Sequence, residues 1–300
     1  MTTPSEVRRG VFYRDDPRGE PAPLVVDVSR SGREYPHDFR SPVALTTAHD
    51  NVSMYVDELF AAAPDRGGTL LYACFPNMYI DTNRSARDID PRLIDGTWPG
   101  PIEPSDFTER GLGLLKRVSR YGEPFQERLL TVAEVQERLA RFHEPYHQEL
   151  SRILKQAHER HGFVVQLSCH CMSAVGAPTH ADPGQARADF NVGDVRGTTS
   201  SRETIEFVVG TLEKLGHTVS VNFPYYGGYL IQRHCDPGAG IDSVFLEVNK
   251  RLFMDVKTFR KTDGFDATHR TATALLEALS AYARGKAERF SPERAHGLSV

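Results

Sequence analysis

Residues 23–32, Pro-Leu-Val-Val-Asp-Val-Ser-Arg-Ser-Gly, join an apolar run to a polar turn. A short apolar run that ends at turn residues predicts a buried strand, here over residues 24–28. The polar residues after it predict a loop at the carboxyl end of that strand. Open α/β sheets bind their ligands at this end. We therefore expect Arg30, in the loop, to contact a substrate.

Strand-like and helix-like segments alternate along the rest of the chain. We expect further strands at residues 69–75, 163–167, 217–222 and 243–248, and helices at 52–63, 131–142, 146–160, 202–215 and 268–286. The pattern predicts a single α/β domain over residues 23–290, with a mainly parallel or mixed sheet flanked by helices. Residues 1–22 are polar and proline-rich, so we expect an irregular arm. We expect a second irregular stretch at 85–110 and a frayed tail at 291–300.

Composition excludes several classes of function. The 300 residues carry a net charge of −4, which gives no reason to expect nucleic acid as a partner. No apolar run approaches the roughly 18 residues of a membrane span, and the N-terminus lacks the apolar core of a signal peptide. We therefore expect a cytoplasmic protein whose four cysteines are reduced. The pair Cys169 and Cys171 is predicted to be two small buried thiols.

Several short motifs accompany the predicted strand ends. They are Asp27-Val-Ser-Arg-Ser-Gly32, Asp81-Thr-Asn-Arg84, Cys169-His-Cys171, Asn222-Phe-Pro-Tyr-Tyr-Gly-Gly228 and Phe245-Leu-Glu-Val-Asn249. Together they resemble the N-formylglutamate amidohydrolase family over about residues 24–260. The resemblance implies a carboxypeptidase- or phosphorylase/hydrolase-like fold of the zinc carboxypeptidase and aspartoacylase type. It also implies hydrolysis of a small N-acyl amino acid or a related carboxylate-bearing amide.

The resemblance implies a zinc ligand at His170, but the two other ligand positions are altered. Arg30 stands where the family offers histidine, and Ser53 stands where it offers an acid. A guanidinium has no lone pair to donate. Its positive charge also repels a dication. At roughly 4 Å and an effective dielectric of about 20, this repulsion is about twice the ~4 kcal/mol of two unit charges. We therefore expect no ordinary zinc site, and a shifted ligand set would use His170 with His49, Asp50 or a neighbouring cysteine. His49 and Asp50 are equally consistent with a solvated helix start.

The resemblance also implies catalytic roles for three residues. Glu247, among apolar neighbours, has the setting in which a carboxylate gains a raised pKa and moves protons, although an ion pair with Lys250 or Arg251 is the alternative. Arg84, with Asn83 beside it, matches the family position that holds a substrate carboxylate, for which a planar guanidinium suits. Asp81 is expected to orient Arg84, or to form a purely structural ion pair with it.

The loop over residues 222–228 carries two glycines after two tyrosines, which predicts close approach of backbone to a ligand. We expect Asn222, Tyr225 and Gly228 to contact the substrate, with Arg233 nearby for an anionic group. His143 and His147 flank Pro145, which disturbs helical spacing, and both are predicted to be structural.

Three hypotheses follow. The first is a hydrolase with an altered metal site, the second a metal-free homologue that binds an acidic small molecule or a partner, and the third a metal-free enzyme with other chemistry that uses Cys169 or Cys171. The partner we expect is a small-molecule carboxylate substrate, the third hypothesis would act on a specialised metabolite, and homo-oligomerisation stays open.

Overall fold

The computed structural model describes residues 4–119, 121–177 and 180–290. An eight-stranded sheet crosses the molecule in the order β1-β2-β4-β3-β7-β10-β8-β9. Its strands are β1 (Glu6–Arg8), β2 (Phe12–Asp15), β3 (Leu24–Val28), β4 (Thr69–Ala73), β7 (Val164–Met172), β8 (Phe190–Gly193), β9 (Val219–Val221) and β10 (Ile241–Asn249). A second, two-stranded sheet pairs β5 (Ile94–Asp95) with β6 (Leu130–Thr131). The predicted tail at 291–300 lies outside the described residues.

Parallel pairing is confined to the centre of the large sheet and to one edge. Strands β4, β3, β7 and β10 run parallel to one another. Strand β2 runs antiparallel to β4, and β8 runs antiparallel to β10. Edge strand β9 runs parallel to β8. The sheet is therefore mixed, and its four central strands deliver their carboxyl ends to the same edge. This confirms the predicted fold class.

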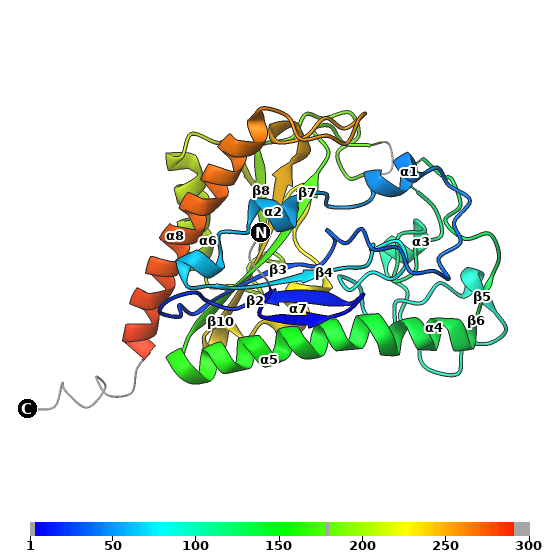
Figure 1. Cartoon of the computed structure of the whole chain (residues 1–300), viewed down its shortest axis with the longest axis horizontal. Coiled ribbons are helices and arrows are strands. Elements are labelled where there is room, and N and C mark those ends of the chain that lie inside the picture. Colours follow the sequence, from blue (N-terminus) through cyan, green and yellow to red (C-terminus); the bar gives the residue numbers. More distant parts are fainter. Residues whose placement is uncertain (1–3, 120, 178–179, 291–300) are drawn as a thin grey trace, which may run out of the picture.

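Helices cover both faces of the sheet (Figure 1). They are α1 (Leu45–Asp50), α2 (Val56–Leu59), α3 (Asp106–Glu109), α4 (Val132–Arg138), α5 (Glu144–His161), α6 (Arg202–Lys214), α7 (Tyr229–His234) and α8 (Gly264–Phe290). One core cluster packs α2, α6 and α8 against the sheet, and a second packs α5 against the other face. None of the described helices has the length and apolar character needed to cross a membrane.

The long helical ridge under the sheet begins where the sequence predicts. Thr131 caps the backbone N–H of Glu134, and the Glu134 carboxylate caps Thr131 in return. Between α4 and α5 the chain widens into a π-helical turn over Leu139–His143. The ridge ends at Gly162, whose φ of 69° suits a residue without a side chain.

Two local predictions are wrong. Residues 6–15 are not an irregular arm, because β1 and β2 form a hairpin that pairs with β4 and completes that edge of the sheet. The predicted helix over 52–63 is interrupted, because Tyr55 takes a left-handed φ of 67° and only a short turn, α2, follows it. Within 85–110 the structure has short elements only, including β5 and α3.

Candidate functional site

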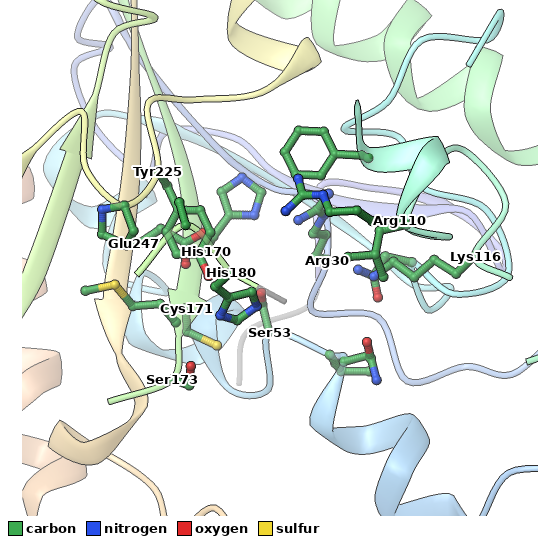
Figure 2. Close-up of a pocket in the computed structure, with 18 of the residues that line it drawn as sticks. Arg30, Ser53, Arg110, Lys116, His170, Cys171, Ser173, His180, Tyr225 and Glu247 are labelled. Carbon is green, nitrogen blue, oxygen red and sulfur yellow. The ribbon is translucent and has the colours of Figure 1, made fainter. Parts of the chain in front are cut away.

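A cavity of about 300 Å³ opens at the carboxyl ends of the central strands. His170 on β7 and Glu247 on β10 lie on one side of it, and Figure 2 shows Arg30, Arg110 and Lys116 on the opposite side. Arg84 also lines the cavity. The structure therefore brings together four residues that the sequence places at one site, namely Arg30, Arg84, His170 and Glu247. Asp50, Ser53 and Tyr225 line the same cavity.

Arg30 is bound to a carboxylate that lies beneath the cavity. Its Nε donates to Asp81 Oδ1 over 3.0 Å and its Nη2 to Asp81 Oδ2 over 2.6 Å. Burial alone raises the pKa of Asp81, but Arg30, Arg84 and Lys116 outweigh burial and lower it to about 2. Asp81 therefore orients Arg30, whereas the sequence predicts that it orients Arg84.

His170 is oriented by a buried hydrogen-bond chain that starts at Asp27. Ser168 Oγ donates its hydrogen to Asp27 Oδ1 over 3.0 Å and lies 3.2 Å from His170 Nε2. While Asp27 is ionised it can only accept, so the single hydroxyl hydrogen of Ser168 goes to Asp27 and Ser168 accepts from His170 Nε2–H. His170 Nδ1 therefore carries a lone pair, and this atom has no partner among the described protein atoms. It is buried at the cavity wall, where it can accept a hydrogen bond from a ligand.

The chain continues away from the cavity through Gln166, which donates to Asp27 Oδ2 over 2.8 Å and accepts from Ser243 over 2.7 Å. Burial raises the pKa of Asp27 to about 7, although Gln166 and Ser168 favour its charged form. This network was not predicted from the sequence. The alternation of polar residues at 166, 168 and 170 in an otherwise apolar strand was the available signal.

Glu247 is the register partner of His170 on the neighbouring parallel strand. Its side chain is not in either predicted ion pair, because Lys250 Nζ donates to the Asp50 carbonyl and Arg251 pairs with Asp189. Its Oε2 is buried without a partner among the described protein atoms. Burial raises the pKa of Glu247 to about 7, although Arg30, Arg187 and Lys250 oppose the shift. A carboxyl group with this pKa both accepts and donates protons at neutral pH.

Arg84 reaches the cavity from the loop after β4. Its Nε donates to the Leu112 carbonyl over 3.1 Å and its Nη1 to the Asn83 carbonyl over 2.8 Å, and the guanidinium stacks 3.8 Å from the Phe107 ring centre. Burial and Arg30 lower its pKa to about 10, so Arg84 is still charged at neutral pH. Two of its nitrogens are engaged by the backbone, which leaves Nη2 to face a ligand.

Three predicted site residues support the cavity without lining it. Asn83 Oδ1 accepts from the Leu230 N–H over 3.0 Å and so ties the Arg84 loop to α7. Gly228 lies against Asn83 so closely that a Cβ would come within 2.3 Å of it. Asn222 takes a left-handed φ of 56° and holds Asp194 through a 2.8 Å hydrogen bond. These residues shape the loops, and neither Asn222 nor Gly228 lines the cavity, so their contact with a substrate stays a prediction.

The structure does not bring Arg233 or His49 into the cavity. Arg233 lines a different hollow beside His143 and His147 and donates to the Tyr229 hydroxyl. The ring of His49 packs edge-on against Phe259. The sequence predicted both residues close to loops that line the cavity, but neither side chain points into it.

His143 and His147 act on the backbone of the Arg84 loop. His143 Nε2 lies 2.9 Å from the Arg84 carbonyl and His147 Nε2 lies 2.9 Å from the Thr82 carbonyl. Burial lowers the pKa of both rings, so they are neutral and donate to these carbonyls. Both histidines therefore have the predicted structural role: they tie the π-helical turn and α5 to the Asp81–Arg84 motif.

The two cysteines of the Cys169-His-Cys171 motif are poor nucleophiles. Cys169 is fully buried and does not line the cavity, and burial raises its pKa well above the ordinary value. Cys171 does line the cavity, but burial raises its pKa to about 11 and keeps the thiol protonated. The thiolate is the reactive form of cysteine, so this setting argues against cysteine chemistry.

The cationic wall and its neighbours were not predicted from the sequence. Phe107 and Arg110 come from the stretch predicted to be irregular, Lys116 lies six residues beyond its end, and His180 and Tyr226 also line the cavity. The Gly111-Leu-Gly-Leu-Leu115 run directly before Lys116 was the available signal.

The residues at the cavity do not fit a three-ligand zinc site. Over the described ranges, no three His, Cys, Asp or Glu side chains converge as metal ligands. His170 offers one lone pair, but Arg30 stands at the cavity where a further ligand is needed. Arg30 is also the second-largest influence on the lowered pKa of His170, after burial. The positive charges of Arg30, Arg84 and Lys116 make the cavity suited to an anion.

The fold and the cavity define an α/β protein with a cavity lined by cationic side chains at the carboxyl ends of parallel strands. The sequence profile of N-formylglutamate amidohydrolase matches residues 22–254. A crystal structure of N-formylglutamate amidohydrolase from Ralstonia eutropha JMP134 superposes with a TM-score of 0.86 at 36% identity, covering 92% of this chain and 99% of the other. The chain belongs to the N-formylglutamate amidohydrolase family.

A more distant crystal structure, of a gene product from Agrobacterium tumefaciens, shares the fold. It superposes with a TM-score of 0.63 at 14% identity and covers 87% of this chain and 92% of the other. No curated protein sequence matches the chain.

Proposed function

We propose that the protein binds a small N-acyl amino acid or related carboxylate-bearing amide and hydrolyses it with Glu247 as the proton-transfer group. One observation carries this proposal. The buried, unpartnered Oε2 of Glu247 and Nδ1 of His170 stand on one side of the cavity, opposite a wall of cations. Membership of the family supports an amidohydrolase-like activity.

Each group has a distinct task in this reaction. The nitrogens of Arg30 and Arg84 that are free of Asp81 and of the backbone hold the substrate carboxylate. Glu247 takes a proton from water as the oxygen attacks the amide carbon, and it returns that proton to the departing amine. His170 Nδ1 accepts a hydrogen bond from the attacking water. The cationic wall stabilises the negative oxygen of the tetrahedral intermediate.

We infer that this chemistry proceeds without the zinc ion that the family resemblance implies. The support is the charge at the site, because Arg30 and its partner Asp81 occupy the place of a ligand. Arginine cannot coordinate a metal, and it repels a dication. Elemental analysis of the purified protein, with and without added zinc, tests this inference. Stoichiometric zinc that is lost in His170→Ala would overturn it.

A second candidate function is binding of an acidic small molecule without turnover. It is favoured by the ion pair between Arg30 and Asp81, which places a fixed positive charge at a position where the family resemblance implies a metal ligand. Both candidates predict binding, but only the first predicts release of an amine.

The deciding experiment measures binding and hydrolysis of N-formyl-glutamate and other N-acyl amino acids in parallel. We expect calorimetry to show binding to wild type and to Glu247→Gln, whereas formate or other acid is released by wild type alone. Binding without release favours the second candidate, and a cavity that binds no such ligand contradicts both.

A further inference from the structure

Lys116 lines the active-site cavity, yet the proposed hydrolysis does not use its amine. The residue is only 6% exposed and lies on the same wall as Arg30 and Arg110 (Figure 2). The acidic group that most affects its pKa is Asp81, whose two carboxylate oxygens already accept hydrogen bonds from Arg30. Across the part of the chain that the structure describes, Lys116 Nζ forms no ion pair. The amine is therefore left for a ligand.

The loop that presents Lys116 is firmly held. Leu114 and Leu115 on its N-terminal side are buried in the core. Arg117 on the other side donates to Asp90 Oδ2 over 3.1 Å. Gly113 lies so close to Thr108 that a Cβ would come within 2.2 Å of the hydroxyl oxygen. The backbone of Lys116 is therefore held on both sides, so its side chain starts from a fixed position at the cavity wall.

The surroundings of Lys116 favour a neutral amine. Burial lowers its pKa, Asp81 opposes the shift, and the charges of Arg30, Arg84 and Lys250 lower it further, to about 7. At neutral pH about half of the amine therefore carries a free lone pair. Burial and cationic neighbours are the two settings in which lysines become nucleophiles. An ordinary surface lysine has a pKa of about 10.4 and is almost fully charged.

We propose that Lys116 is an amine nucleophile that captures a small 2-oxo acid in this cavity as a Schiff base. The Nζ lone pair adds to the ketone carbon, and a proton moves from nitrogen to oxygen to give a carbinolamine. The hydroxyl group then leaves with a proton as water, and the C=N bond forms. No oxidant or reductant is needed, and water addition reverses the step.

The other residues of the cavity fit this ligand class. A 2-oxo acid carries its carboxylate next to the ketone, so the guanidiniums of Arg30 and Arg84 bind the charge beside the amine. Glu247, whose pKa is about 7, is partly protonated at neutral pH and supplies the acid that loss of water requires. This capture goes beyond amide hydrolysis, in which Lys116 acts only through its charge.

Reductive trapping tests the proposal on the whole protein. The folded chain is incubated with pyruvate and cyanoborohydride, which reduces an imine to a stable secondary amine, and the adduct is located by peptide mass mapping. We expect one adduct per chain, on Lys116, and at least tenfold slower trapping at exposed lysines such as Lys155. The trapping rate should rise through a pH of about 7, not above 10.

Two variants sharpen the result. Lys116→Arg keeps a positive charge and should lose the adduct, whereas Lys155→Arg, on the exposed face of α5, should keep it. If Lys116→Arg does not fold, the position of the adduct in the wild-type protein, found by peptide mapping, still tests the proposal. No adduct on Lys116, or equal labelling of Lys155 and Lys116, would overturn the proposal.

The outcome is independent of the proposed hydrolysis, which is assayed on the same preparations with N-formyl-glutamate. Trapping without amide hydrolysis refutes the hydrolase proposal alone. Hydrolysis without trapping refutes the Schiff-base proposal alone.

Discussion

Arg30 and Asp81 form a two-pronged ion pair, with Nε and Nη2 of the arginine 3.0 and 2.6 Å from the two carboxylate oxygens. Asp81 is fully buried, whereas Arg30 reaches the cavity. The pair therefore holds a guanidinium group in the strand-end loop at the edge of the cavity. It also fixes the direction in which the remaining nitrogen of Arg30 points.

Removal of Arg30 should destabilise the whole fold. Arg30→Gln leaves the Asp81 carboxylate buried without its main partner, and such a change costs about 3–5 kcal/mol. Urea unfolding measures the loss. Arg202→Gln, which breaks an exposed pair with Glu206 on α6, is the matched control and should change stability by less than about 1 kcal/mol. Equal effects of the two substitutions would mean that the Arg30–Asp81 pair contributes little.

Hydrolysis should increase with pH through the pKa of Glu247. A general base acts only after it has lost its proton, so kcat/KM should rise with a midpoint at about pH 7. Glu247→Gln should abolish this rise and lower kcat by at least about a hundredfold. A pH profile that Glu247→Gln leaves in place would assign the base to another residue.

The tautomer of His170 should reverse when Asp27 is replaced by Asn. The Asn amide oxygen still accepts from Gln166, and its NH₂ group then donates to Ser168 Oγ. Ser168 in turn donates to His170 Nε2, so the ring proton moves to Nδ1. Nitrogen NMR of labelled histidine measures the change directly, and Ser168→Ala serves as a control that removes the link. An unchanged Nε2–H ring in Asp27→Asn would show that the chain does not set the tautomer.

Burial of Asp27 should make the fold more stable in mild acid than above neutral pH. The pKa of Asp27 is about 7 in the folded state and 3.8 ordinarily, so the folded chain binds the proton more tightly. The stabilisation that comes from this tighter proton binding is complete below about pH 4 and is lost as the pH rises through about 7. The free energy of unfolding of Asp27→Asn, measured across this range, should vary less with pH than that of wild type. If Asp27→Asn and wild type showed the same pH dependence of unfolding, a group other than Asp27 would take up the proton.

Ligand binding should weaken when Arg84 is changed. Arg84→Ala removes a buried charge at the cavity and should cost about 2–5 kcal/mol in affinity for an N-acyl amino acid. Arg84→Lys keeps the charge but cannot make both hydrogen bonds to the Leu112 and Asn83 carbonyls, so binding should weaken severalfold or more. Calorimetry measures both. Unchanged affinity in Arg84→Ala would leave the arginine a structural role only.

The central sheet and the convergence of its motifs were predictable because both follow from local patterns. Apolar runs mark β3, β7 and β10, and parallel strands bring their ends together, so His170 and Glu247 were placed correctly. The edge hairpin was missed because its residues are polar and its pairing with β4 is long-range. Short strands of this kind carry little sequence signal.

Side-chain direction was the part that sequence could not supply. Arg233 and His49 lie near the expected segments but do not line the cavity, because Arg233 lines the hollow beside α5 and His49 packs against Phe259. Lys116 was missed because its loop has no regular periodicity. The partner of Arg30 was missed because Asp81 lies fifty-one residues away in the chain, and no local pattern links them.

The register between β7 and β10 has a consequence for insertions and deletions. Glu247 pairs with His170, and Leu246 pairs with Cys169 in the core beneath. Because successive side chains alternate between faces, one residue inserted within β10 would turn Glu247 into the core and expose its apolar neighbour to the ligand. The same insertion in a surface turn would leave the pairing intact. The chain can therefore gain or lose residues in its outer loops over generations. Within β7 and β10 it cannot, because a change of spacing would move His170 or Glu247 away from the cavity.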